Sequence, residues 1–153
     1  MSIDAALLTS LSGPAGRLPQ AAAEKLASMG RLERIDAGTT IMRAGDQATR
    51  FHILLAGRLQ LLLPHPRPVV IQTLREGDLA GISWFRPPYR WQWDVVSIGP
   101  VTTASFDAFE VGTACEADFD FREAIVELVL AEVYQRLGAT RLQLIDIYEA
   151  VRT

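Results

Sequence analysis

A series of short strand-like runs between residues 32 and 106 constrains the fold of this chain more than any other feature. Turn signals separate the runs, and the prolines fall in these turns instead of inside the strands. The clearest runs are Arg50 to Leu55, Arg58 to Leu63, Val69 to Leu74, Val95 to Ile98 and Val101 to Phe106. Short, evenly punctuated strands of this kind predict a mainly β sandwich, barrel or roll.

Helical patterns flank the strands on both sides. Residues 1–30 are predicted to be helical, with a break at residues 12–17. After residue 107 we expect a short helix from Phe109 to Cys115 and then a long helix, capped by Asp118 or Asp120, that reaches about Ala150. The chain is therefore expected to be one domain with three parts, namely helices at 1–30, a β-roll at 32–106 and helices at 107–153.

Composition indicates a globular protein. Hydrophobic residues make up 49% of the 153 residues, no apolar run has the roughly 18 residues of a membrane helix, and no signal peptide is recognisable. Cys115 is the only cysteine, so a reducing cytoplasm is the expected compartment. The net charge of −3 does not favour binding to nucleic acid.

The predicted last helix carries an apolar seam in steps of four and three residues. Such a seam over three to four heptads favours self-association through paired helices, with packing on the roll as the alternative. A second apolar stripe is available for the roll, at Ile125, Val129, Leu142, Ile145 and Tyr148. The seam positions are Val126, Leu130, Val133, Leu137, Thr140, Leu144, Ile147 and Val151.

Gly138 lies inside this helix, where glycine costs about 1 kcal/mol relative to alanine. Its neighbour Thr140 is the polar member of the seam. The pair indicates a place where a second backbone or a ligand approaches the helix closely.

All three tryptophans fall in the loop at residues 77–94, which begins like an anion-binding loop. Gly81 would let the backbone approach an anion, and the amides of Ile82 and Ser83 would open a short helix. Arg90 could pair with a phosphate through its planar guanidinium. The alternative is a glycine turn between two strands, with Arg90 in solvent.

Several segments of the chain resemble the cyclic-nucleotide-binding domain. They are Asp36 to Asp46, Phe51 to Gly57 and Leu74 to Gly81, while Arg136 to Arg141 resembles the ligand-facing part of the long helix in catabolite activator proteins. The resemblance covers about residues 18–150. It implies an eight-stranded jelly roll, or double-stranded β-helix, with helices at both ends. It also implies a homodimer through the last helix, with Thr140 and Arg141 near the ligand.

The loop departs from the family pattern at the residues that would bind ligand. Ile82 occupies the position of the family glutamate that accepts a hydrogen bond from the ribose hydroxyl. Without this acceptor, binding of the sugar would lose roughly 1–3 kcal/mol. The family arginine falls close to Trp91, and Arg90 reaches that position only if the loop shifts by one residue. The aromatic residues could stack on a flat ligand, but filling of the pocket is favoured for Trp91 and Trp93.

The sequence gives no support for an enzyme or a metal site. His52 and His65 are the only histidines, Cys115 has no cation nearby in sequence, and no catalytic triad motif is present. Because family regulators carry a helix-turn-helix after the long helix and this chain stops at Thr153, we expect no DNA binding.

Together these features predict a non-catalytic, stand-alone sensor of a cyclic nucleotide or other anionic small molecule, acting on an unidentified protein partner. The alternative is a degenerate, ligand-free domain that keeps the fold for protein–protein contact.

Overall fold

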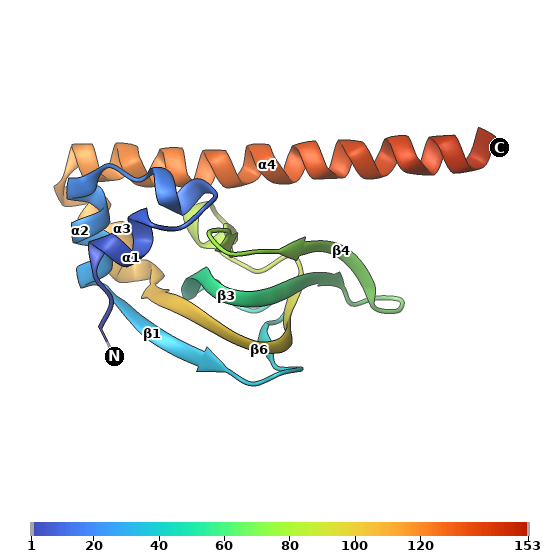
Figure 1. Ribbon diagram of the computed structural model, residues 1–153, viewed down its shortest axis with the longest axis horizontal. Coiled ribbons are helices and arrows are strands. Elements are labelled where there is room, and N and C mark those ends of the chain that lie inside the picture. Colours follow the sequence, from blue (N-terminus) through green and yellow to red (C-terminus); the bar gives the residue numbers. More distant parts are fainter. Residues whose placement is uncertain (1, 153) are drawn as a thin grey trace.

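The computed structural model describes residues 2–152 and contains a β-roll that two groups of helices flank in sequence; in space these helices lie together at one end of the roll, and the last helix runs along one side of it (Figure 1). The helical segments on the N-terminal side are α1 (Ala5–Thr9), the 3-10 helix η1 (Pro14–Arg17) and α2 (Gln20–Ser28). On the C-terminal side, α3 (Ala108–Ala117) leads into the long α4 (Phe119–Arg152). The expected break at residues 12–17 contains η1, whose first residue is Pro14, a favoured position for proline in a helical turn.

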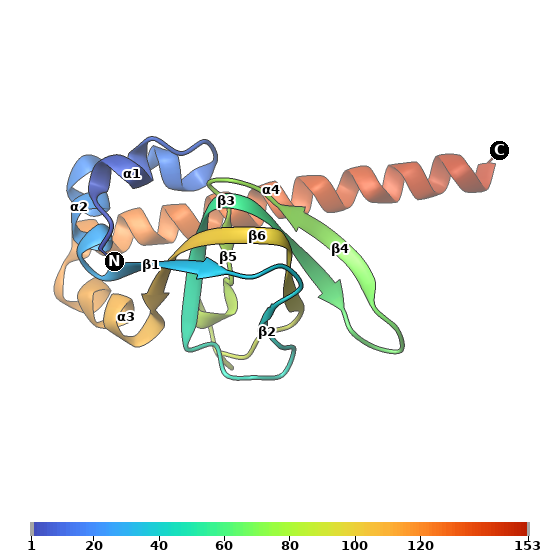
Figure 2. The same cartoon turned by 60° about the horizontal axis from the view of Figure 1, so that its bottom comes forward.

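Six strands form one antiparallel sheet that curls into the roll (Figures 1 and 2). The strand order is β1-β6-β3-β4, with β2 paired to β6 and β5 paired to β3. The strands are β1 (Gly30–Ile35), β2 (Thr40–Met42), β3 (Arg50–Leu63), β4 (Val69–Leu74), β5 (Leu79–Ala80) and β6 (Asp94–Asp107). The short 3-10 helix η2 (Ser83–Phe85) interrupts the chain between β5 and β6.

The roll has six strands where the family resemblance implies eight, because two pairs of expected runs are continuous. Arg50 to Leu55 and Arg58 to Leu63 are the two halves of β3, which bends at register shifts on either side of Ala56. The two runs around Gly99 likewise join into the 14-residue β6. Bulges of this kind bend a strand without ending it, so a turn signal in the sequence does not always separate two strands.

The core lies between the roll and the helices. Phe51 of β3 stacks on Trp84 with ring centroids 4.2 Å apart and on Phe106 at 5.0 Å. Leu26 of α2 and Ile125 of α4 are fully buried on the helical side. These contacts fix η2, and with it the loop after Gly81, against the centre of the molecule.

Helix α4 begins at a cap made by Asp118, whose side chain accepts a hydrogen bond from the Phe121 N–H at 3.1 Å. The helix has 34 residues, and it projects well past the roll toward the C-terminus (Figures 1 and 2). Near the end of the roll, Gln143 Nε2 of α4 donates a 2.9 Å hydrogen bond to the Ile71 carbonyl of β4.

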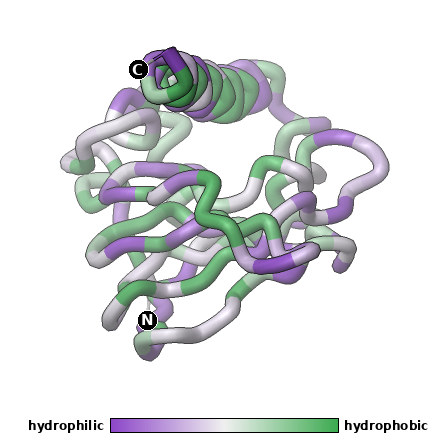
Figure 3. The backbone as a smooth tube through the Cα atoms, turned by 90° about the vertical axis from the view of Figure 1, so that its right-hand side faces the viewer, coloured by the Kyte–Doolittle hydropathy of each residue, from purple (hydrophilic) through white to green (hydrophobic). Residues whose placement is uncertain are grey.

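The predicted seam of α4 does not pack on the roll. Its apolar members are 40–79% exposed in the single chain, and Figure 3 shows hydrophobic stretches along the outer turns of the helix. The second stripe divides into two parts: Ile125 is buried and Val129 is partly buried against the core, whereas Leu142, Ile145 and Tyr148 are exposed. The assignment of that whole stripe to the roll was therefore wrong, because the helix extends past the surface it would cover.

Candidate functional site

Trp91 packs directly against Gly81, at the centre of the predicted anion loop. A Cβ atom added to Gly81 would lie 2.7 Å from the Trp91 ring and 3.0 Å from Met42. Gly81 also has a φ of +97°, in the left-handed region that favours glycine. The close approach that Gly81 permits is therefore made by an indole of the same chain, which is itself 9% exposed.

The residues after Gly81 form a very short helical turn. Ser83 opens η2, which has three residues, and Ile82 is its N-cap and lies partly buried against the core. The Trp84 indole N–H donates to the Gly81 carbonyl at 3.1 Å, which fixes the direction of the loop. Trp93 is partly buried and packs against the core.

Arg90 is exposed at the surface of the loop. Its Nη1 donates to the Gly45 carbonyl at 2.9 Å, and its backbone forms an isolated bridge with Gln47. The guanidinium is thus engaged with the turn before β3.

Thr140 and Arg141 are exposed on α4, close to the end of the roll. The Thr140 hydroxyl donates to the Arg136 carbonyl at 2.9 Å, one helical turn earlier. Among the described residues 2–152, neither residue forms a hydrogen bond or ion pair with the loop after Gly81, so the structure of a single chain does not bring the two predicted groups together.

The sequence analysis did not predict Glu132 of α4, the most buried charged side chain among the described residues. Its side chain is fully buried, and its Oε1 accepts the Leu79 N–H at 2.7 Å. Its Oε2 pairs with Arg136 Nε at 3.1 Å, and Arg136 also donates to the Leu79 carbonyl. Both backbone groups of Leu79, two residues before Gly81, are therefore held by one turn of α4. Burial raises the pKa of Glu132, against the lowering effect of Arg136 and the Leu79 N–H.

A second contact between α4 and the same segment involves Asp78, the residue before Leu79. Asp78 is 5% exposed, and its Oδ1 accepts from Gln135 Nε2 at 2.9 Å. Its Oδ2 accepts the Arg75 N–H at 2.8 Å and closes the turn that leads into β5. We use "the α4 clamp" below for the set of Asp78, Leu79, Glu132, Gln135 and Arg136.

The remaining titratable candidates have structural environments. His52 is buried, and its Nδ1 lies 2.9 Å from the Thr103 hydroxyl. Burial lowers the pKa of His52 from 6.5 to about 4. His65 lies exposed in the turn between β3 and β4. Cys115 is half-buried, and burial raises its pKa, which is unfavourable for a thiolate nucleophile.

Two features are absent from residues 2–152, the part of the chain that the structure describes. No group of three or more histidine, cysteine or acidic side chains in this range is arranged to hold a metal ion. None of the helices in the same range has both the length and the apolar character needed to cross a membrane.

Comparison with known sequences identifies the family. The sequence model of the cyclic nucleotide-binding domain matches residues 32–118, which is more than half of the chain. The chain therefore belongs to the cyclic nucleotide-binding domain family. A search of curated proteins finds no match. Domains of this family are regulatory modules, and the fold of this chain is that of a sensor or regulatory module.

Solved structures agree on the fold. A protein of Geobacter metallireducens GS-15, described as a candidate cyclic nucleotide-binding protein, aligns with a TM-score of 0.78 at 18% identity over 88% of this chain and 98% of its own. A cyclic nucleotide-binding domain from Methylobacillus flagellatus KT aligns at 0.77 and 11% identity over 92% and 80%. The c-di-GMP-responsive regulator CLP of Xanthomonas campestris aligns at 0.71 and 14% identity over 80% and 61%.

Proposed function

We propose that this chain is a dimeric regulatory module that acts through protein contacts and whose phosphate loop is closed to cyclic nucleotides. The observation that carries the proposal is the Trp91 ring against Gly81, because a phosphate would need the same space. Removal of this buried indole from the core would be costly, since large aromatic side chains contribute strongly to core packing.

The charges around the loop support the same proposal. Arg90 donates to the Gly45 carbonyl, and Arg136 is committed to Glu132 and Leu79. Ile82 supplies no side-chain acceptor for a sugar hydroxyl. An anion at the loop would therefore have to compete with contacts that the protein already makes.

The exposed seam of α4 supports the dimer. A row of apolar side chains in steps of four and three is the pattern by which two helices pair. Pairing would cover side chains such as Leu130 and Leu137, which are 57% and 45% exposed in a single chain.

Calorimetric titration with cyclic AMP and cyclic GMP tests the closed loop. We expect no saturable binding by the wild type at tens of micromolar nucleotide. Trp91→Ala removes the obstruction, and adding Ile82→Glu to it restores the missing acceptor. Cyclic nucleotide binding is therefore expected in the double variant at lower nucleotide concentrations than in Trp91→Ala. Circular dichroism establishes that both variants are folded. Micromolar binding by the wild type would contradict the proposal.

A second candidate, a sensor of a different anionic ligand, is favoured by the α4 clamp. The clamp joins the segment before Gly81 to the helix that carries the seam, which is the connection that a ligand-controlled dimer needs. A thermal-shift screen of nucleotides and phosphorylated metabolites tests it. If the sensor is correct, some compound stabilises the wild type, Arg90→Ala abolishes the shift, and Thr140→Val weakens it while leaving the dimer intact. A shift that persists in Arg90→Ala would exclude the loop as the anion site.

A further inference from the structure

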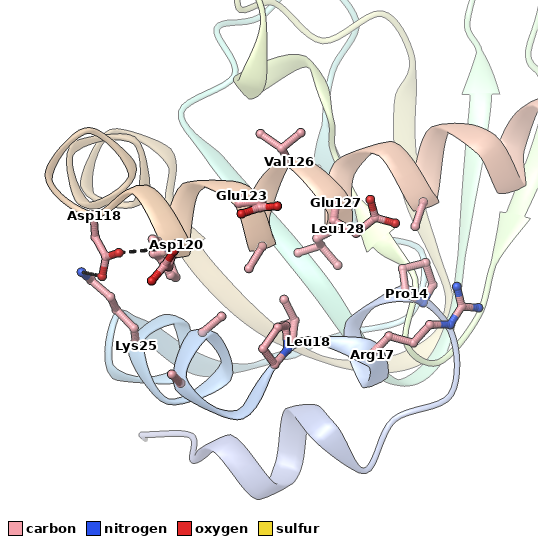
Figure 4. Close-up of a pocket in the computed structure, with 16 residues that line it drawn as sticks. Pro14, Arg17, Leu18, Lys25, Asp118, Asp120, Glu123, Val126, Glu127 and Leu128 are labelled. Atoms are coloured by element: carbon pink, nitrogen blue, oxygen red, sulfur yellow. Dashed lines mark hydrogen bonds and ion pairs between the residues drawn. The ribbon is translucent and has the colours of Figure 1, made fainter.

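A groove separates α4 from the segment formed by η1 and α2, on the outer surface of the molecule (Figure 4). It encloses about 770 Å³. Its apolar lining comes from both sides and includes Leu18 and Ala22 from the N-terminal segment and Ala124 and Leu128 from α4. The groove is therefore framed by two helical elements, with an apolar base between them.

One wall of the groove is acidic. Asp120, Glu123 and Glu127 project from successive turns of α4, and Figure 4 shows Glu123 and Glu127 along the groove. Among the described residues 2–152, the ion pairs are Lys25–Asp118, Arg31–Glu33 and Arg136–Glu132. None of the three wall carboxylates forms an ion pair within that range, and the groove's two cations, Arg17 and Lys25, lie on the opposite side, where Lys25 is paired with Asp118.

The groove continues along α4 as a second hollow of about 790 Å³, which shares Arg17, Glu127 and Ala131 with the first. Its far part is lined by Gly138 and Leu142. A Cβ atom at Gly138 would meet nothing within 4 Å, so the glycine faces open space. Ala124, Ala131 and Gly138 are seven residues apart, and small side chains at this spacing allow a second helix to lie close to the backbone.

The groove borders the seam along α4, because Val126 lines the first hollow and Leu130 lines the second. Its small-residue line is farther away: a helix advances 100° per residue, so Ala124, Ala131 and Gly138 are about 160° around the axis from Val126, Val133 and Thr140. A dimer formed through the seam would therefore share one edge of the groove and leave this small-residue line uncovered.

We propose that this groove binds a basic amphipathic α-helix from another protein. This inference rests on the proposed interaction function and names the surface that carries it. The apolar base accommodates the apolar face of such a helix, and Lys or Arg side chains beside that face meet the unpaired acidic wall. A second copy of this chain fits less well, because its long α4 carries six acidic residues against four basic ones.

Fluorescence anisotropy with designed 22-residue helical peptides tests the proposal. The probe has a Leu/Ala stripe flanked by lysines, and its counterpart has glutamate in place of every lysine. We expect the lysine peptide to bind the full chain and the glutamate peptide to bind at least about tenfold more weakly, because its charges repel the wall. The double substitution Glu123→Gln and Glu127→Gln should lower the affinity for the lysine peptide by at least about tenfold.

Two matched controls separate the groove from the overall charge of the protein. Glu110→Gln with Glu116→Gln removes two carboxylates from α3 and should change the affinity by less than about twofold. Gly138→Leu should block the hollow and reduce binding about tenfold or more, whereas Gly112→Leu, at an equally open glycine of α3, should not. Both leucine substitutions favour the helix, so loss of folding is not expected.

Several results would overturn the proposal: equal binding of the two peptides, equal weakening by the two glutamine pairs, or unchanged affinity in Gly138→Leu. A fall in molecular mass of Gly138→Leu by light scattering would assign the groove to a second copy instead. None of these results depends on the nucleotide titration, so failure of this inference and failure of the closed loop are distinguishable.

Discussion

At the scale of single residues, the most consequential position is Trp91. The sequence placed a tryptophan near the family arginine, and the structure shows its ring where the backbone of Gly81 would otherwise face open space. Trp91 therefore both replaces the family arginine and fills the space beside Gly81. The presence of glycine in a family motif is therefore no indication that the motif binds its ligand, because the free space above the glycine is set by its neighbours.

His52 provides a pH test at this scale. Burial lowers its pKa from 6.5 to about 4, so the unfolded chain takes up a proton at a higher pH than the folded one. The stability that depends on neutral His52 is present above pH 6.5 and is lost as the pH falls toward 4. We expect urea denaturation to give a free energy of unfolding about 3 kcal/mol lower at the acidic end of this window.

A substitution isolates this contribution from that of the carboxylates. His52→Gln should flatten the dependence of stability on pH between 6.5 and 4, whereas His65→Gln, in the exposed turn, should keep the wild-type slope. Equal slopes in wild type and His52→Gln would show that His52 does not govern this range.

At the scale of elements, the α4 clamp joins the turn before β5 to the long helix. The clamp could have been anticipated from one signal in the sequence. Ile125, Leu128 and Glu132 continue one core-facing line of α4 at spacings of three and four, so Glu132 is a charged residue at a core position. Arg136, four residues later, supplies the partner that a buried carboxylate requires.

The free energy that the clamp contributes can be measured with Glu132→Ala. The substitution leaves the Leu79 N–H and the largely buried Arg136 without their partner, and such a loss typically costs about 3–5 kcal/mol. Glu132→Gln should cost less, since it retains an oxygen acceptor. Gln143→Ala, which removes an exposed hydrogen bond to Ile71, should cost under about 1 kcal/mol in the same urea titration. Equal costs for Glu132→Ala and Gln143→Ala would show that the clamp is not a principal contact.

The strands and helices were predictable to different degrees. The expected run Val69 to Leu74 coincides with β4, and the helix expected at Phe109 to Cys115 lies inside α3. The joining of four runs into β3 and β6 was not predictable from turn residues, because a bulge and a turn use the same glycines. The orientation of the Arg90 side chain could not be predicted from the sequence either, because it depends on a hydrogen bond to the carbonyl of Gly45, which is 45 residues away.

At the scale of the whole molecule, the exposed seam predicts a dimer. Light scattering at tens of micromolar should give about twice the chain mass for the wild type. Leu137→Glu and Leu144→Glu place like charges in the contact and should each lower that mass. Phe109→Glu, at an 84% exposed position of α3, should leave it unchanged. A monomeric wild type would exclude the dimer at this concentration.

The length of α4 beyond the clamp has a mechanical consequence. From Glu132 to Arg152 the helix rises about 30 Å, and its last part, about 14 Å beyond the hydrogen bond from Gln143 to Ile71 of β4, extends past the roll. A tilt of 5° at the clamp would therefore displace the tip by about 2.6 Å, close to half a helical turn. A helix that pivots beside the loop in this way would act as a lever, so a small adjustment at Leu79 would be enlarged into a larger movement of the tip.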